Sequence, residues 1–323
     1  YSVNFLPHWL NWNFTGYDQK DDWSDITNLY SGLNQLEPGR IMWEPNSDLN
    51  KYGTPMVLMT IPMFTNHESV EGLYFDSSIT TPFHFVTVSG VAESPSNPVG
   101  GLSYINGDFD RGVRYMKELG VDYFISYTDS ITDKAIMSNE LENLFHSSPF
   151  TVFKIYSDKV QVVDAEVVNF NQPELVERIS NSIFKQEKTD SFFNLAMKEF
   201  KLDNKKRIIE GIDTEESQIQ NRIPGKKSEI NNVRISNNEI TFETDHPNEL
   251  HIVKVSYFPN WKIENGSGPY RLSPSFMGVI PYSNEVSITF ENTSLEKSLN
   301  IVSLIIFLLT AYLLVFRIKK YAE

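Results

Sequence analysis

The chain has 323 residues, of which 40% are hydrophobic and 13% aromatic, so it can build more than one apolar core and is not of disordered composition. Its formal net charge of -14 repels polyanions and argues against a nucleic-acid partner. It contains no cysteine, which excludes disulfides, thiolate nucleophiles and cysteine-ligated zinc.

Residues 1–36 predict an aromatic and helical entry segment. Apolar residues recur there at spacings of three and four, which is the period of a helix with one buried face: Trp23, Ile26, Leu29, Tyr30 and Leu33. Pro38 and Gly39 end the pattern. The chain begins at Tyr1 without an initiator methionine or a signal segment, so we expect it to be the C-terminal part of a longer protein.

Residues 37–169 predict a small α/β domain. A short apolar strand in "GRIMWEPN" is followed by "TPMVLMTIPMF", which we expect to be a buried strand. Asp108 or Asp110 can cap a helix in "RGVRYMKELG", which ends at Gly120. The segments "VDYFISYTD", "FTVFKIYS" and "VQVVDAEVV" are rich in β-branched and aromatic residues and predict three further strands.

Residues 170–225 predict a helical connector. Pro173 is suited to the first turn of one helix. A second helix is expected to begin near Asp190, with apolar residues on one face at Phe193, Ala196, Met197 and Phe200. The polar run "DNKKRIIEGIDTEESQIQNRIPGKKSE" is expected to be an irregular link.

Residues 226–297 predict an antiparallel β-sandwich, because apolar and polar residues alternate in short runs. Two such runs flank a turn at Asn237-Asn238, and "LHIVKVSYF", "SFMGVIP" and "EVSITFEN" supply further strands. The expected fold class is therefore α+β, with a small α/β domain, a helical connector, a C-terminal antiparallel β-sandwich and one terminal transmembrane helix.

The transmembrane helix is predicted at 298–318, where a run from Leu299 to Phe316 carries no charge. A buried core helix is the alternative, but a run of this length matches the hydrocarbon core of a bilayer. Basic residues follow at Arg317, Lys319 and Lys320, and basic flanks stay on the cytoplasmic side. We therefore expect the cell membrane, with membrane lipid as a partner, an extracytoplasmic soluble region and a cytoplasmic tail at 319–323.

Three N-glycosylation sequons lie in the region that this topology places outside the membrane. They begin at Asn13, Asn265 and Asn292. They are expected glycosylation sites only if the chain faces the outside of a membrane.

No phosphate-binding glycine loop and no other motif of cofactor chemistry is present, so no cofactor is expected. The segment "HESVE" places His67 and Glu71 at the closest approach to metal-ligand spacing, but the turn signals around it favour a solvated loop and no metal. His84 in "TTPFHFVTV" alternates with Phe83 and Phe85, which in a strand places it on the opposite face from those rings. It can line a pocket with Glu71 and Asp76, or it is a hydrogen-bonded structural histidine.

Aromatic residues gather in "VKVSYFPNWKIENGSGPYRLSPSFMGVIP". Tyr257, Phe258, Trp261 and Tyr270 can form a stacking platform for a sugar ring. A sandwich this small also needs large side chains to fill its core, and the core interpretation is favoured.

Six segments carry a resemblance to a known family: "GRIMWE", "YGTPMVLMTIPMFT", "EGLYFDSS", "LGVDYFISYTD", "PFTVFKIY" and "SYFPNWKIENGSGPYRLSPSFMGV". Together they resemble the extracytoplasmic region of the 6-pyruvoyl-tetrahydropterin-synthase-related and YfhO-like polytopic membrane proteins, which are similar in plan to GT-C glycosyltransferases.

The resemblance implies a part in cell-envelope glycan synthesis, with a polyprenyl-linked sugar or a glycan acceptor and upstream transmembrane helices of the same protein as partners. It implies that the catalytic carboxylates lie upstream of Tyr1, so no catalytic residue is assigned. The alternative is a non-catalytic, membrane-anchored glycan-binding or scaffolding module. Candidate substrate-binding residues are Arg40, Trp43, Glu44, His67, Glu71, Tyr74, His84 and Trp261. For Arg40 and Glu44, a structural ion pair is the alternative.

Overall fold

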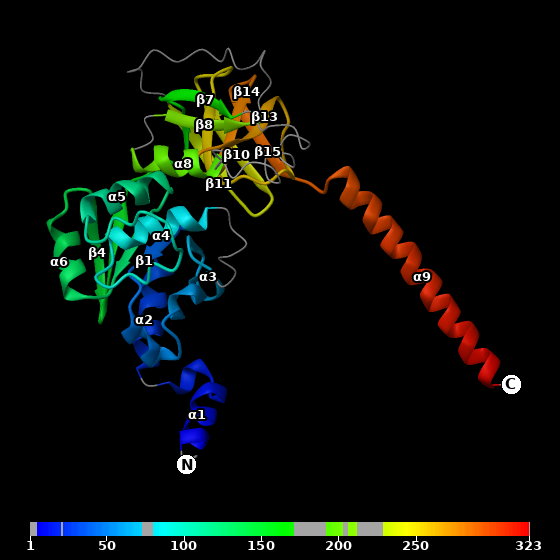
Figure 1. The fold of residues 1–323 in the computed structure, drawn as a ribbon, viewed down its shortest axis with the longest axis horizontal. Coiled ribbons are helices and arrows are strands. Elements are labelled where there is room, and N and C mark those ends of the chain that lie inside the picture. The colour runs from blue at the N-terminus through cyan, green and yellow to red at the C-terminus, as the bar shows by residue number, and fades with distance from the viewer. Residues whose placement is uncertain are drawn as a thin grey trace, which may run out of the picture.

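The computed structural model describes residues 5–20, 22–72, 80–170, 192–202, 206–211 and 229–322. These residues form an N-terminal half built around one mixed sheet, a C-terminal half of two packed sheets, and a long terminal helix (Figure 1). The predicted α+β fold class, with its β-sandwich and one apolar terminal helix, is confirmed.

The N-terminal sheet has the strand order β2-β1-β3-β5-β4. Parallel pairing joins β1 to β2 and to β3, and antiparallel pairing joins β3 to β5 and β5 to β4. Its strands are β1 (Arg40–Trp43), β2 (Glu68–Ser69), β3 (Tyr123–Ser126), β4 (Leu141–Ser147) and β5 (Phe150–Ile155). The helical elements of this half are α1 (Phe5–Phe14), η1 (Tyr17–Gln19), α2 (Trp23–Leu33), η2 (Ser47–Tyr52), η3 (Val57–Thr60), α3 (Ile61–Phe64), α4 (Thr81–Gly90), α5 (Phe109–Glu118) and α6 (Asp129–Met137).

The two faces of this sheet bury separate sets of side chains, because successive residues of a strand point to opposite faces. In β1, Ile41 and Trp43 join the core under α2, η2, η3 and α3, whereas Met42 joins the core under α4, α5 and α6. Tyr123 and Phe124 divide in the same way in β3. The predicted helix face of α2 is confirmed, since Ile26, Leu29, Tyr30 and Leu33 are all buried.

The C-terminal half contains a six-stranded sheet of order β6-β11-β14-β13-β8-β7 and a four-stranded sheet of order β12-β15-β10-β9. Pairing is antiparallel except between β7 and β8, which run parallel. The strands are β6 (Val160–Val162), β7 (Glu166–Phe170), β8 (Lys206–Glu210), β9 (Ile230–Ile235), β10 (Glu239–Thr244), β11 (His251–Ser256), β12 (Trp261–Ile263), β13 (Gly266–Leu272), β14 (Phe276–Pro281) and β15 (Glu285–Phe290). Helix α8 (Phe192–Lys201) also belongs to this half.

The six-stranded sheet is buried on both faces and is the middle layer of the molecule. On one face, Ile252 and Ile280 share a core with α4, α5 and α8. On the other face, Val253 and Val279 pack against the four-stranded sheet. The core around α4 and α5 is therefore continuous from the N-terminal sheet to the six-stranded sheet. Such an apolar interface holds two halves in one arrangement more firmly than a polar one.

Several local expectations are wrong or need correction. The expected strand in "TPMVLMTIPMF" is instead helical, in η3 and α3, and the segment around His84 is helix α4, buried on all sides. The expected irregular link contains strand β8. Strands β6 and β7, which the sequence grouped with the N-terminal domain, belong to the six-stranded sheet. The helix expected at Pro173 lies outside the described residues.

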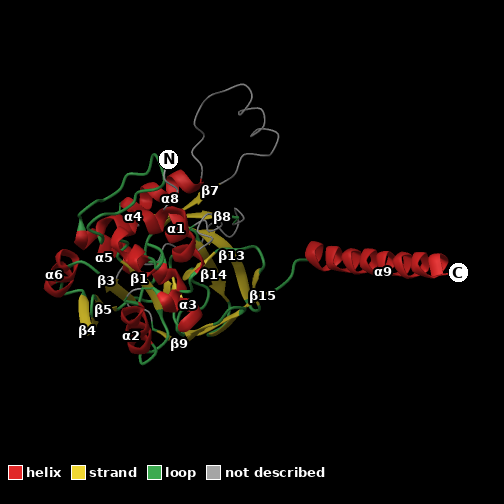
Figure 2. Ribbon diagram, turned by 90° about the horizontal axis from the view of Figure 1, so that it is seen from below, coloured by secondary structure: helices red, strands yellow, loops and turns green. Residues whose placement is uncertain are grey.

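Helix α9 (Ser294–Ala322) projects from the body of the molecule (Figure 2). Its segment Ser294–Leu314 is long and apolar enough to cross a membrane, and none of it is buried against the described part of the chain. Thr293 and Glu296 form a capping box: the Glu296 carboxylate accepts from Thr293 N at 2.6 Å, and Glu296 N donates to the Thr293 hydroxyl at 3.2 Å. Buried Asn260 also donates to that carboxylate at 2.7 Å, which ties the start of α9 to the sandwich.

Helices α4 and α5 cross at two glycines. A Cβ atom on Gly90 would lie 2.8 Å from the carbonyl oxygen of Asp108 and 3.1 Å from Cα of Gly112. Because these are backbone atoms, they cannot move aside as a flexible side chain would. The close crossing of α4 and α5 thus depends on Gly90 having no side chain.

We expect Gly90→Ala to destabilise the fold by about 1–3 kcal/mol, the usual cost of forcing extra volume into a packed core. Urea unfolding of the full chain in detergent micelles, followed by tryptophan fluorescence, measures this cost. Gly100→Ala is the matched control, since its added Cβ meets nothing within 4 Å. Equal unfolding midpoints for Gly90→Ala and the unmodified chain would show that the two helices do not cross this closely.

Candidate functional site

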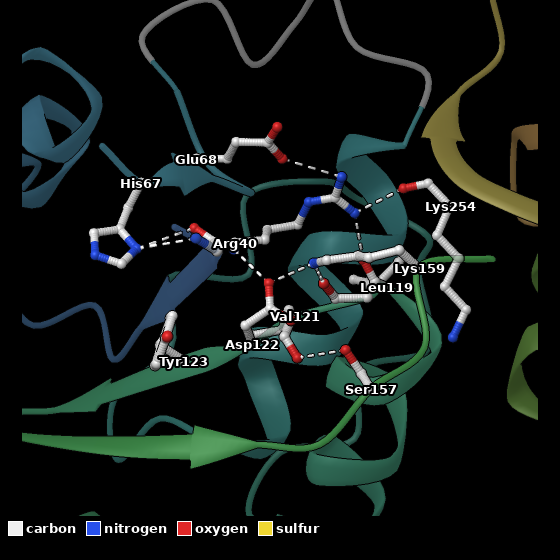
Figure 3. A network of polar contacts seen from close by, with 12 residues as sticks. Arg40, His67, Glu68, Leu119, Val121, Asp122, Tyr123, Ser157, Lys159 and Lys254 are labelled. Atoms are coloured by element: carbon white, nitrogen blue, oxygen red, sulfur yellow. Dashed lines mark hydrogen bonds and ion pairs between the residues drawn. The ribbon is translucent and has the colours of Figure 1, made fainter. Parts of the chain in front are cut away.

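Three cations from three separate segments bind the C-terminal end of α5. Lys254 Nζ donates to the carbonyl of Lys117 at 2.8 Å, Arg40 Nη1 donates to that of Leu119 at 2.8 Å, and Lys159 Nζ donates to that of Gly120. Carbonyl groups at a helix C-terminus carry partial negative charge and need donors from outside the helix. We call these three side chains the cationic cap of α5 (Figure 3).

The cationic cap joins the two halves of the molecule. Arg40 lies in β1 of the N-terminal sheet and Lys254 in β11 of the six-stranded sheet, and Arg40 Nη1 also donates to the Lys254 carbonyl at 2.8 Å. Lys159 contacts Asp122 Oδ2 at 2.6 Å, and the same oxygen accepts from Arg40 N at 2.6 Å. Gly120, at φ +68°, allows this approach, since a Cβ there would lie 3.2 Å from Arg40 Nη1.

Burial changes the acidity of the two lysines. It lowers the pKa of Lys254 to about 8, and burial together with the nearby Arg40 lowers the pKa of Lys159 to about 8. Both lysines therefore remain mostly protonated at neutral pH and keep their hydrogen bonds to the end of α5.

A cleft of 640 Å³ lies between the two halves, next to the cationic cap. This volume is in the range of small-molecule sites. Its walls come from the N-terminal half through Arg40, Glu68, Ser69, Val70, Gly72, Thr80, Thr81, His84 and Leu119, and from the C-terminal half through Ile235, Ser236, Asn237, Lys254, Val255, Ser256, Trp261 and Phe276. Three of the predicted binding residues, Arg40, His84 and Trp261, thus meet at one site.

His84 is the most unusual polar group of the cleft. The residue is only 3% exposed, and Nε2 has no hydrogen-bond partner within the part of the chain that the structure describes. Glu71 Oε2 lies 3.6 Å away, which is beyond hydrogen-bonding distance. A buried polar atom without a partner costs about 1–3 kcal/mol, so a ligand group that reaches Nε2 from the cleft would remove that cost.

His84 and Glu71 form a pair in which burial disfavours both charges. Burial lowers the pKa of His84 to about 4 and raises the pKa of Glu71 to about 7. Near neutral pH the imidazole is therefore uncharged, and the glutamic acid holds its proton about half of the time. His84 lines the cleft from helix α4 and not from a strand. Glu71, which was expected to line a pocket with it, is not among the lining residues, although its Oε2 lies 3.6 Å from His84 Nε2.

Trp261 belongs to both the core and the cleft. It is 8% exposed, packs with the sandwich core and meets the ring of Phe290 edge-on at 5.2 Å between centroids. Tyr270 is also buried, whereas Phe258 is 52% exposed. The aromatic residues of segment 253–281 thus belong mainly to the core, and Trp261 is the one of these four aromatic residues that also lines the cleft.

The predicted binding residues Trp43, Glu44 and His67 do not line the cleft. Trp43 is buried in the core beneath α2. Fully buried Glu44 accepts from the backbone N–H groups of Tyr127 and Thr128 at 2.9 Å each, so its carboxylate anchors the turn before α6 and does not pair with Arg40. The side-chain partner of Arg40 is Glu68, at 3.3 Å.

His67 has a structural role in this fold. Nε2 lies 2.8 Å from the Leu33 carbonyl, Nδ1 lies 3.2 Å from Gly39 N, and the ring meets Tyr123 edge-on. Both ring nitrogens are therefore engaged by the backbone. Tyr74 and Asp76 lie outside the described residues. The sequon residues Asn13, Asn265 and Asn292 are all exposed, and their glycosylation stays a prediction.

Sequence analysis missed most of the C-terminal wall of the cleft, namely Ser236, Asn237, Lys254 and Ser256. One signal was available, because Lys254 interrupts an apolar strand, and a lysine at a buried position needs a specific partner. Ser256 lies 3.3 Å from the hydroxyl of Thr80 across the cleft, a contact that no local pattern encodes.

Comparison of the chain with protein-family models, with curated proteins and with solved structures gives no match.

The opposed acidities of Glu71 and His84 predict a pH effect on stability. Between about pH 4.5 and 6.5 the folded pair holds one proton on Glu71, and the unfolded pair holds one on His84, so the two contributions cancel. Glu71→Gln removes the contribution of Glu71 and leaves that of His84. The unfolded state then binds more protons than the folded state. The free energy of unfolding should therefore rise with pH across this window, by up to roughly 1.4 kcal/mol per pH unit more than in the unmodified chain.

Urea unfolding of the full chain in detergent at a series of pH values measures this difference in slope. Glu68→Gln is the matched control, because the Glu68 side chain is mostly exposed, and it should leave the slope unchanged. A Glu71→Gln slope equal to that of the unmodified chain would show that the two groups are not buried together.

Proposed function

We propose that this chain is a membrane-anchored, ligand-binding region whose interdomain cleft holds a glycan and contributes no catalytic nucleophile. The proposal rests on buried His84, which lines a cleft of 640 Å³ and whose Nε2 has no hydrogen-bond partner among the described residues. A ligand hydroxyl can donate to this nitrogen and remove the cost of leaving it unpaired.

The chemistry of the cleft favours an uncharged, hydroxyl-rich ligand. Its two cations, Arg40 and Lys254, already donate to backbone carbonyls at the end of α5 and in β11, and Arg40 also pairs with Glu68, so they have few N–H groups left for an anion. The remaining polar lining consists mainly of hydroxyl and amide groups, and Trp261 adds an aromatic side chain that a sugar ring can contact. Sugars combine hydroxyl groups with an apolar ring face and suit such a surface.

The cellular setting follows from α9 and from the resemblance. An apolar terminal helix of this length supports membrane anchoring. The basic residues Arg317, Lys319 and Lys320 support a cytoplasmic C-terminus and an extracytoplasmic cleft. The resemblance to GT-C-like proteins supports a part in envelope glycan synthesis, in which the cleft binds the glycan of a polyprenyl-linked donor or an acceptor.

Filling the cleft should abolish glycan binding. Ser256 is exposed on the cleft wall at the end of β11, and Ser256→Trp places a large ring in that space. We expect at least a tenfold loss of affinity, measured by saturation-transfer NMR on the full chain in lipid nanodiscs with a panel of neutral oligosaccharides.

Ser103→Trp is the matched control, since Ser103 is exposed and does not line the cleft. It should bind glycans as the unmodified chain does. Circular dichroism checks that both variants are folded. If no neutral oligosaccharide binds the unmodified chain, or if Ser256→Trp binds as tightly as Ser103→Trp, the cleft is not a glycan site.

A further inference from the structure

Helix α1 exposes an unusual number of large apolar side chains. Phe5 is 66% exposed, Trp9 53% and Phe14 82%, and Leu6, Leu10 and Trp12 are also exposed. None of the ten residues of the helix is buried. A contiguous apolar surface of this kind marks an interaction site and not an ordinary soluble surface.

The exposed side chains are arranged as in a helix that lies on a membrane. At 100° per residue, the aromatic and leucine side chains occupy one broad arc of α1, and the opposite arc holds Pro7, His8 and Asn11. The helix carries no charged side chain other than the titratable His8. Tryptophan is enriched where a membrane meets water, because its ring is apolar and its N–H can still reach a polar partner.

A lipid surface is the partner that the rest of the molecule favours. In Figure 1, α1 projects from the lower end of the N-terminal half, and α9 runs from the sandwich towards the same end of the molecule. A membrane that α9 crosses therefore lies on the side where α1 is exposed. Lys20 lies over the ring of Trp12, 4.3 Å from its centroid, which places a cation beside the aromatic arc, as is typical at the level of lipid headgroups.

We propose that α1 lies in the interface of the membrane that α9 crosses, with its aromatic arc among the lipid acyl chains. This inference rests on the membrane anchoring proposed above. The chain is then held at two points, through α9 and through α1, and the cleft is fixed in orientation above the bilayer.

One consequence concerns Asn13, the first of the predicted glycosylation sites. Asn13 lies within the apolar arc of α1, where its side chain donates to the Trp9 carbonyl at 2.8 Å. A glycan on Asn13 and an α1 embedded in lipid are mutually exclusive, because a glycan cannot enter the acyl region. The proposal therefore assigns glycosylation, if any, to Asn265 and Asn292.

The absence of cysteine makes the test direct, because a single introduced cysteine can be spin-labelled without background. Leu10→Cys, Leu304→Cys and Met137→Cys, each at an exposed side chain, are labelled in the full chain and reconstituted in phosphatidylcholine vesicles. Power-saturation electron paramagnetic resonance then compares collisions with apolar oxygen and with a water-soluble nickel chelate.

We expect the label at position 10 to collide with oxygen more than with nickel, as at position 304 in α9, and the label at position 137 in α6 to show the reverse. Nickel access at position 10 equal to that at 137, with 304 in lipid, would overturn the α1 proposal and leave the anchoring intact. Low access to both reagents at position 10 would also overturn it, since α1 would then be covered by protein. Nickel access at position 304 would instead overturn the anchoring itself.

Discussion

The arrangement of this molecule depends on how the C-terminal end of one helix is satisfied. The last carbonyls of α5 face the junction of two sheets, and three cations from β1, from the segment before β6 and from β11 supply the donors that the helix lacks. Each cation alone would be costly to bury. Held together around one helix end, they fix the N-terminal sheet and the six-stranded sheet in one relative orientation. Arg207 of β8 adds an ion pair to Glu118 of α5 at 2.8 Å.

The cleft is a consequence of that junction. The apolar core around α4 and α5 runs without interruption into the six-stranded sheet, and the cationic cap holds the polar edge of the same contact. The space left beside the cap is bounded by both halves, so it exists only while they are in contact. His84 reaches this space because α4 is packed between the two halves. Its Nε2 has no hydrogen-bond partner in the described part of the chain, and burial raises the pKa of the nearby Glu71 to about 7, so the cleft is suited to a polar but uncharged ligand.

The sequence pattern predicted those elements that have one buried face and one exposed face. Periodicity predicts the buried faces of α2 and α8, and local turn chemistry predicts the N-cap of α5 at Asp108 and the hairpin at Asn237-Asn238. It failed for η3, α3 and α4, because the residues of these helices are apolar on nearly every face, and such a run cannot be told from a buried strand by its pattern. In the candidate site, the sequence correctly predicted Arg40, His84 and Trp261 as cleft residues, but it also predicted Trp43 and Glu44, which do not line the cleft. Whether a strand-end residue faces a cleft or a core is decided by contacts distant in sequence, such as that between Arg40 and the Lys254 carbonyl.

The contacts of the cationic cap imply that both halves form one cooperative unit. Native-state hydrogen exchange of the full chain in nanodiscs tests it most directly, by comparing the free energies of opening of β5 and β14. We expect equal values for the two strands, and an equal decrease in both when Lys254→Met removes one cation. A lower value for β14 while β5 stays protected would show that the sandwich opens alone, and the cleft would not be a preformed site.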